Sequence, residues 1–171
     1  MPIILRQMAH LPKSLGPTIS GRGKSKPAVS QAAVAKKGPE ASFIPLYTQL
    51  VGGDPVVAIR RGLPVSAADD IVKSGAITSG EFYDVVIPRK TLTNRRATGS
   101  LTPDQSDKLV RVARVIAKAE QTFGNPEKAH RWLRRPTALL NGEEPLKLLD
   151  TEAGARAVEE LLIRIDHGIA A

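Results

Sequence analysis

The sequence predicts an all-α fold, and three observations lead to this prediction. Ser66, Thr78 and Thr102 are each followed three positions later by an acid or an amide. In such a pair the hydroxyl accepts a hydrogen bond from the third amide of a new helix, and the acid or amide reaches back to the cap residue. Apolar residues after Thr102 recur at steps of three and four, which is the period of a helix. No segment alternates apolar and polar residues as a half-buried strand does.

Residues 1–41 differ in composition from the rest of the 171-residue chain. They hold seven basic residues against the single acid Glu40, and so carry six of the eight net positive charges. They are rich in Gly, Pro, Ser and Ala, and their short apolar runs bury too little surface to offset the loss of chain entropy. We expect a flexible basic arm that adds non-specific contacts with phosphate. A functionless extension is an alternative that explains the same composition. A mitochondrial presequence is another, although the apolar face that such a helix needs is poor here.

The composition also excludes several classes of protein. Because the chain has no cysteine, it has no disulfide, thiol nucleophile or thiolate metal site, which fits a reducing cytoplasm. No apolar run approaches the roughly 18 residues of a membrane-spanning helix. The three histidines, His10, His130 and His167, do not have a metal-ligand spacing. We therefore expect no metal, no cofactor and no catalytic residue. A small hydrolase is a remote alternative, since no nucleophile stands beside a base.

The marked helix starts follow one another from residue 42 onward. Ser66 is the first, and Thr78 opens a short helix over 79–86. Thr102 opens the longest helix, which ends near Gly124. Its expected faces are an apolar one with Leu109, Val112, Ala113, Ile116 and Phe123 and a polar one with Lys108, Arg111, Arg114 and Lys118.

Two further helices are expected in the C-terminal part. Asn125-Pro126 starts one of them, and Pro136 stops it. The other runs from about Thr151 and can be closed by Gly168. Trp132 lies on the apolar side of the first of these helices, so we expect it to be a core residue rather than a contact for a partner.

Residues 79–96 have the form of a helix-turn-helix. A capped helix expected to bury Phe82 is followed by a tight turn at Ile87-Pro88 and by a second helix that points Leu92 inward. The exposed face of the second helix is expected to carry Arg89, Lys90, Thr91, Asn94, Arg95 and Arg96. In DNA, arginine binds guanine and asparagine binds adenine through two hydrogen bonds, while threonine or lysine can hold a phosphate. These six residues are our candidate DNA contacts, in agreement with the net charge of +8. A merely solvated basic face is the alternative.

The turn between these two helices departs from the common helix-turn-helix sequence Leu-Gly-Ile-Ser. Here the turn is Val85-Val86-Ile87-Pro88, which has a β-branched residue where glycine would adopt a left-handed conformation. Either the turn is built differently, or the two helices cross at an altered angle.

The C-terminal third contains a series of spaced motifs. They are, in order, Gly124-Asn-Pro126, Trp132-Leu133, Gly142-Glu-Glu-Pro145-Leu-Lys-Leu148-Leu149 and a terminal helix over 158–168. This series resembles the toxin-binding domain of the Xre/MbcA/ParS antitoxins, and residues 75–124 are similar to the Xre-like helix-turn-helix half of that family. The resemblance covers residues 50–171, and the arm matches nothing in the family.

The resemblance implies a type II antitoxin. Such a protein is a cytoplasmic homodimer that binds and neutralises a cognate toxin, represses its own operon through the helix-turn-helix, and catalyses nothing. The usual partner is a RES-domain toxin, an enzyme that destroys NAD. The expected domains are the arm over 1–41, the Xre-like helix-turn-helix domain over 42–123 and the toxin-binding domain over 124–171. A stand-alone helix-turn-helix regulator without a toxin partner is the alternative, but it leaves the last domain without a function.

The resemblance also favours the C-terminal end as the part that enters the toxin. The candidate residues are Arg164, Asp166, His167, Gly168, Ile169, Ala170 and Ala171. The terminal carboxylate can pair with the cations that an NAD site needs for phosphate, while Ile169 fills an apolar part of the pocket. Three arginines of an earlier helix, Arg131, Arg134 and Arg135, are either solvated or meet DNA phosphate or an acidic rim of the toxin.

Overall fold

The computed structural model describes residues 42–169, so the predicted arm and the two last residues, Ala170 and Ala171, lie outside the described range. Within that range every regular element is a helix, apart from an isolated bridge between Pro64 and Ser100, and the all-α prediction is confirmed. No helix there is both long and apolar enough to cross a membrane. The elements are α1 (Ile44–Val51), α2 (Pro55–Arg61), α3 (Ser66–Lys73), α4 (Ser79–Val85), α5 (Arg89–Thr98), α6 (Pro103–Phe123), α7 (Pro126–Leu133), the 3-10 helices η1 (Ala138–Leu140) and η2 (Lys147–Asp150), and α8 (Glu152–Asp166).

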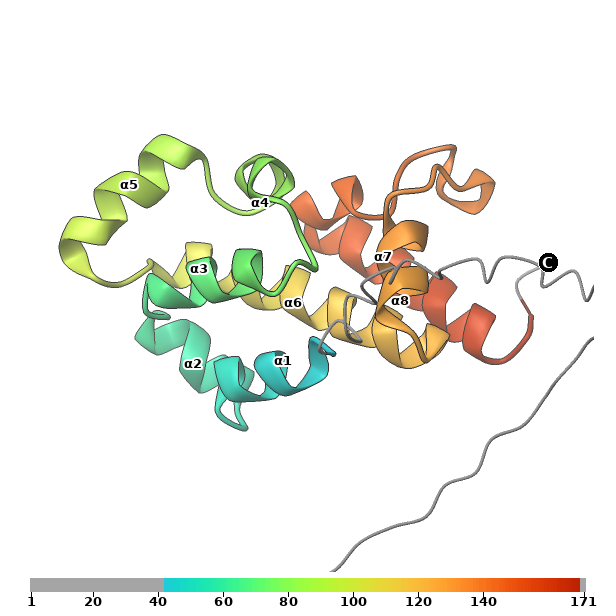
Figure 1. Ribbon diagram of the computed structural model, residues 1–171, viewed down its shortest axis with the longest axis horizontal. Helices are drawn as coiled ribbons and strands as arrows, with labels where there is room; N and C mark the ends of the chain where they lie inside the picture. The colour runs from blue at the N-terminus through green and yellow to red at the C-terminus, as the bar shows by residue number, and fades with distance from the viewer. Residues whose placement is uncertain (1–41, 170–171) are drawn as a thin grey trace, which may run out of the picture. The chain divides into compact units, whose positions relative to one another are not determined.

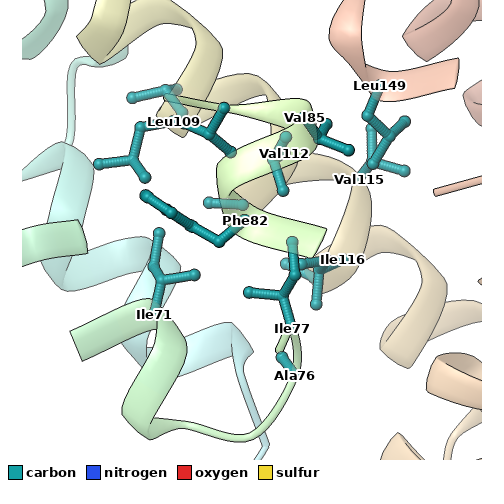
Figure 2. Packing of buried hydrophobic residues seen from close by; sticks show 14 of the residues in the cluster. Ile71, Ala76, Ile77, Phe82, Val85, Leu109, Val112, Val115, Ile116 and Leu149 are labelled. Carbon is teal, nitrogen blue, oxygen red and sulfur yellow. The ribbon is translucent and has the colours of Figure 1, made fainter. Parts of the chain in front are cut away.

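Helix α6 lies at the centre of the described residues (Figure 1). Helices α1, α2, α7 and α8 all pack against it. The predicted apolar positions Leu109 and Val112 are fully buried, but so is Val115, which lies outside the predicted stripe. Because neighbours cover α6 on several sides, its buried surface is wider than one stripe. Figure 2 shows Phe82 of α4 between Ile71 of α3 and Leu109 of α6.

Most helix starts follow the predicted signals. Thr78 and Thr102 form complete capping boxes at α4 and α6. The side chains of Asn125 and Thr151 accept hydrogen bonds from the first turns of α7 and α8. Gly124 follows the last residue of α6, and its φ of 59° is left-handed, as the prediction of a glycine stop requires.

The predicted cap at Ser66 is wrong. Ser66 is the first residue of α3, and Val65 before it already has the right-handed helical conformation and caps nothing. Val65 is buried, and its N–H donates to the carbonyl of Gly99, next to the Pro64–Ser100 bridge. This packing fixes the entry into α3, so Ser66 cannot adopt the extended backbone of a cap residue.

The turn between α4 and α5 contains no left-handed residue. Val86 ends α4 with φ −104° and ψ −65°, and Pro88 precedes α5 with φ −54° and ψ 142°. Val85, Val86 and Ile87 are all buried. The first of the two predicted alternatives therefore holds: the turn is built differently, from apolar side chains that anchor it in the core.

The described residues belong to one compact unit. Helix α6 ends at Phe123, where the predicted boundary between the last two domains lies, but it packs against helices on both sides of that boundary in the sequence. The division at residue 123 stays a prediction.

Candidate binding surfaces

Helix α5 buries only Leu92, as predicted, and presents its polar side chains outward. Its candidate DNA contacts other than Arg96 are exposed or half-buried, and their side chains form no hydrogen bond or ion pair within the described residues: Arg89, Lys90, Thr91, Asn94 and Arg95. Unpaired arginine and asparagine side chains near the start of a helix are what direct readout of base edges requires.

Arg96 is the exception among the candidate residues of α5. Its guanidinium donates two hydrogen bonds to the Asp69 carboxylate of α3, with lengths of 3.1 Å and 2.6 Å. These bonds and the charge of Asp69 raise the pKa of Arg96 above its ordinary value. Arg96 is exposed, as expected, but it is not available in the way the other five are, since its side chain ties α5 to α3. Its role as a DNA contact stays a prediction.

The start of α5 lies beside the start of α6. A hollow of about 150 Å³ is lined by Val86, Ile87, Pro88 and Thr91 from the turn and α5, and by Asp104, Gln105 and Lys108 from α6. The candidate DNA surface is thus placed at the N-terminal end of α6.

The last turn of α8 and the residues after it are also exposed. The predicted toxin contacts that the structure describes there form no side-chain hydrogen bond or ion pair within residues 42–169: Arg164, Asp166, His167, Gly168 and Ile169. The chain leaves the helix at Gly168, whose φ is 68° and whose N–H donates to the Ile165 carbonyl at 2.9 Å. Figure 1 shows this end of α8 on the side of the fold away from α5. Ala170 and Ala171 lie outside the described residues.

Arg134, at the end of α7, is held inside the fold rather than presented to a partner. Its guanidinium donates to both carboxylate oxygens of Glu81 at 2.6 Å and 2.8 Å, and to the carbonyls of Ala76 and His130 at 3.1 Å and 2.9 Å. Burial alone would raise the pKa of Glu81, but hydrogen bonds from Arg134 and Thr78 and the charge of Arg134 outweigh it and lower the pKa. Because Glu81 also completes the capping box of α4, Arg134 joins α7 to the helix-turn-helix.

Arg111 of α6, predicted on the polar face, is buried. Its guanidinium donates to the Glu152 carboxylate of α8 at 3.0 Å, to the Asp150 carbonyl at 3.2 Å and to the Asp107 carboxylate. Arg114, one turn later, donates to Glu159 of α8 at 2.7 Å. The expectation that Arg111 is exposed is wrong because acids of α8 pack over it.

A second buried polar group was not predicted from the sequence. Glu120 of α6 accepts hydrogen bonds from the N–H of Phe43 at 2.6 Å and the hydroxyl of Ser42 at 2.9 Å, and lies 2.9 Å from Nε2 of His130. The only sequence feature that could have indicated the burial of Glu120 is its place directly after the apolar Ala119. The cluster holds the start of α1 against α6 and α7. Among residues 42–169, no group of three or more His, Cys, Asp or Glu side chains could hold a metal ion.

Two segments of the chain match families of known proteins. Residues 54–114 match the antitoxin Xre-like helix-turn-helix domain, and residues 118–168 match the antitoxin Xre/MbcA/ParS C-terminal toxin-binding domain. Antitoxin Xre of Pseudomonas putida is 39% identical over 111 residues, which are 64% of this chain and 69% of that protein. Antitoxin Xre of Yersinia enterocolitica is 35% identical over 117 residues, which are 67% of this chain and 79% of that protein. The chain belongs to the Xre antitoxin family.

This Xre-family antitoxin is also similar to the Prs ADP-ribosylating antitoxin of a Sphingobium species, with 24% identity over 126 residues that span 67% of this chain and 79% of that protein. The resemblance predicted from the sequence is confirmed. The helix-turn-helix match ends at residue 114 and the toxin-binding match begins at residue 118, so both boundaries fall inside α6. Helix α6 is therefore shared by the two domains of the family.

Proposed function

We propose that this antitoxin binds operator DNA through α5 and binds a RES-domain toxin, an enzyme that degrades NAD, through the C-terminal end of α8. In this proposal it acts as a homodimer in the bacterial cytoplasm and carries out no chemistry of its own. The observation that carries the proposal is the position of the unpaired polar side chains. Such side chains cover the exposed face of α5 and the last turn of α8, on opposite sides of the fold (Figure 1), whereas Arg111 and Arg114 of α6 are paired. The matches to a toxin-binding domain and to a helix-turn-helix domain support a toxin and DNA as partners.

Helix α5 has the features of a recognition helix. Arg89, Asn94 and Arg95 offer donors that can bind base edges, and each good pair of hydrogen bonds discriminates against the wrong base by about 1–3 kcal/mol. Two copies related by a two-fold axis would present two α5 helices to the half-sites of a palindromic operator. Binding there would repress transcription of the operon that encodes the antitoxin.

The exposed end of α8 has the features of an active-site plug. A site that binds the phosphates of NAD holds cations, and the Asp166 carboxylate could pair with them. Ile169 is 64% exposed and offers an apolar side chain to the rest of such a pocket. The segment is completed by Arg164, His167 and Gly168, and by Ala170 and Ala171 outside the described range. Inhibition of this kind is steric and electrostatic, so the antitoxin needs no catalytic group.

The test is NAD consumption by the purified toxin whose reading frame adjoins that of this chain. Removal of residues 168–171 should leave the complex and operator binding intact but restore NAD loss. Lys73→Ala, a change of an exposed residue of α3, is the control and should keep full inhibition. Equal inhibition by the truncated and the full chain would exclude the plug, and a toxin that leaves NAD intact would exclude the RES class. A full chain that binds its operator but no toxin would be a stand-alone regulator.

A further inference from the structure

One side of α7, together with the end of α6, forms an aromatic and basic hollow of about 250 Å³. Its lining residues, which we call the α7 hollow, are Phe123, Lys128, Arg131, Trp132 and Arg135. The rings of Phe123 and Trp132 lie 5.5 Å apart at an angle of 45°. Trp132 packs against the core and is only half-buried, so part of its ring faces this hollow. Trp132 therefore packs against the core as predicted but is not itself a buried core residue, because part of its ring contributes to the surface.

The three cations of the α7 hollow have no anion to balance them. Lys128, Arg131 and Arg135 are exposed and their side chains form no ion pair or hydrogen bond within the described residues. Lys128 and Arg131 belong to α7, and Arg135 lies two residues beyond its last residue, Leu133. Arg134 between them shows the opposite arrangement, since its guanidinium is bound to Glu81. A cluster of unpaired cations beside an aromatic pair is complementary to an acidic partner.

The position of the hollow favours a protein partner over the DNA bound by α5. The hollow includes Phe123, the last residue of α6, whereas Thr91 of α5 lies beside Asp104 at the start of α6. The 21 residues of α6 span roughly 30 Å at about 1.5 Å per residue. Figure 1 shows α7 and the C-terminal end of α8 on the side of the fold away from α5. The hollow also lies within residues 118–168, which match the toxin-binding domain.

We propose that the α7 hollow is a second docking surface for the toxin, and that it accepts an acidic segment of the toxin with an apolar or aromatic side chain. The apolar side chain contacts Trp132 and Phe123, and the acids pair with Arg131 and Arg135. Tryptophan and arginine are the residues that contribute most to protein interfaces. This inference rests on the proposed function and assigns its two parts to different surfaces. The α7 hollow provides most of the affinity for the toxin, and the end of α8 provides the inhibition.

The experiment measures the dissociation constant of the full chain and its toxin by calorimetry. Arg131→Glu with Arg135→Glu should raise the dissociation constant at least about thirtyfold, because two pairing charges become repulsive. Trp132→Ala should raise it about tenfold. The matched control is Arg60→Glu with Lys73→Glu, which makes the same change of net charge at exposed, unpaired residues of α2 and α3. It should change the constant less than about threefold, since charges at a distance are screened.

A direct measurement of the hollow is also possible, because Trp132 is the only tryptophan of the chain. Labelled with 5-fluorotryptophan, the antitoxin gives one fluorine resonance, which should shift when unlabelled toxin is added. Removal of residues 168–171 should leave this shift in place and raise the dissociation constant far less than the double arginine variant does, while it abolishes inhibition. The double arginine variant, at saturating concentration, should still inhibit fully.

The outcomes separate this inference from the proposed function. If the unaltered chain binds no toxin, the proposed function itself fails. If it binds and inhibits, but the double arginine variant binds as tightly as the control variant, the hollow is not a docking surface and the function stands. If that variant instead loses operator affinity and keeps the toxin, the hollow meets DNA and the proposal is overturned. A neutral pair, Arg131→Gln with Arg135→Gln, should give an intermediate effect and guards against a folding defect caused by the added acids.

Discussion

Helices α5 and α8 meet the rest of the fold in opposite ways. Helix α5 buries only Leu92 among its ten residues. Helix α8 buries four apolar residues along one face, namely Ala155, Val158, Leu161 and Leu162. Its acids Glu152 and Glu159 bind Arg111 and Arg114 of α6, whereas the basic residues of α5, apart from Arg96, are unpaired within the described range.

This difference shows that unpaired charge, rather than charge as such, marks a candidate surface. Helix α6 has four basic residues, as α5 does, but its Arg111 is bound by Glu152 and the Asp150 carbonyl next to α8. Helix α8 itself changes along its length: its first turns are paired and buried, and its last turn, with Ile163 46% exposed, resembles α5 in its lack of partners. Both candidate surfaces thus lie on helical segments whose polar side chains mostly have no partner within residues 42–169.

The largest effect is expected at Gly154, where α8 approaches η2. A Cβ at this position would lie 2.0 Å from the carbonyl oxygen of Leu148 and 2.9 Å from its carbonyl carbon, so backbone must move. We expect Gly154→Ala to lower the free energy of unfolding by at least about 3 kcal/mol, although alanine favours helices. The measurement is urea unfolding followed by circular dichroism.

Gly80 of α4 is the matched control for Gly154. It too is a helical glycine, but no atom outside its own neighbourhood lies within 4 Å of the Cβ that alanine would add. Gly80→Ala should therefore stabilise the protein, by up to about 1 kcal/mol. If both substitutions had the same effect, α8 would not be packed against η2 as closely as described.

The second prediction concerns the buried arginine of α6. Arg111→Ala should lower the free energy of unfolding by about 2–3 kcal/mol, somewhat less than the loss for a fully buried pair, because the Asp107 and Glu152 carboxylates are 46% and 44% exposed. Arg89→Ala on α5 should change it by less than about 0.5 kcal/mol. Chemical unfolding of the two variants measures the contrast, and equal losses would mean that Arg89 has a partner in the fold.

The third prediction concerns binding through α5. Alanine at Arg89, Asn94 or Arg95 should each weaken operator binding by about 1–3 kcal/mol while the fold and toxin neutralisation survive. Alanine at Arg131 and Arg135 together should leave operator affinity unchanged, because these residues lie at the other end of α6. Fluorescence anisotropy with operator DNA is the measurement. Unchanged operator affinity in a folded Arg89→Ala/Arg95→Ala variant would show that α5 is not the helix that binds the operator.

The sequence predicted what depends on neighbours in the chain. The caps at Thr78 and Thr102 involve residues three positions apart, and the inward position of Leu92 follows from the helical period, so both were found. Pairings between distant residues were missed: Arg111 binds Glu152 41 positions away, and Arg134 binds Glu81 53 positions away. Helical periodicity places an arginine of this kind on the polar face of its helix. It does not indicate whether another helix will pack over that face.

The smallest effect is expected where α4 of the helix-turn-helix joins α7. Hydrogen bonds and charge from Arg134 lower the pKa of Glu81 in spite of its burial. A carboxylate whose pKa is lowered on folding adds stability that is present above its unfolded pKa of about 4.3 and is lost as pH falls through the folded value. The contribution should stay below about 1 kcal/mol, because the side chains of Glu81 and Arg134 are 27% and 30% exposed and solvent screens the pair.

Glu81→Gln tests this link because glutamine can still complete the capping box of α4 while it cannot ionise. Between pH 5 and about pH 3, the unaltered chain should therefore lose more of its free energy of unfolding than the Glu81→Gln variant. Glu160→Gln, which changes an exposed acid of α8 without a partner among the described residues, should follow the unaltered chain. Urea unfolding at several pH values gives the change of the free energy of unfolding with pH, as one slope for each of the three proteins. Parallel slopes for Glu81→Gln and the unaltered chain would mean that Arg134 does not hold the carboxylate ionised, and the link between the helix-turn-helix and α7 would then rest on apolar packing alone.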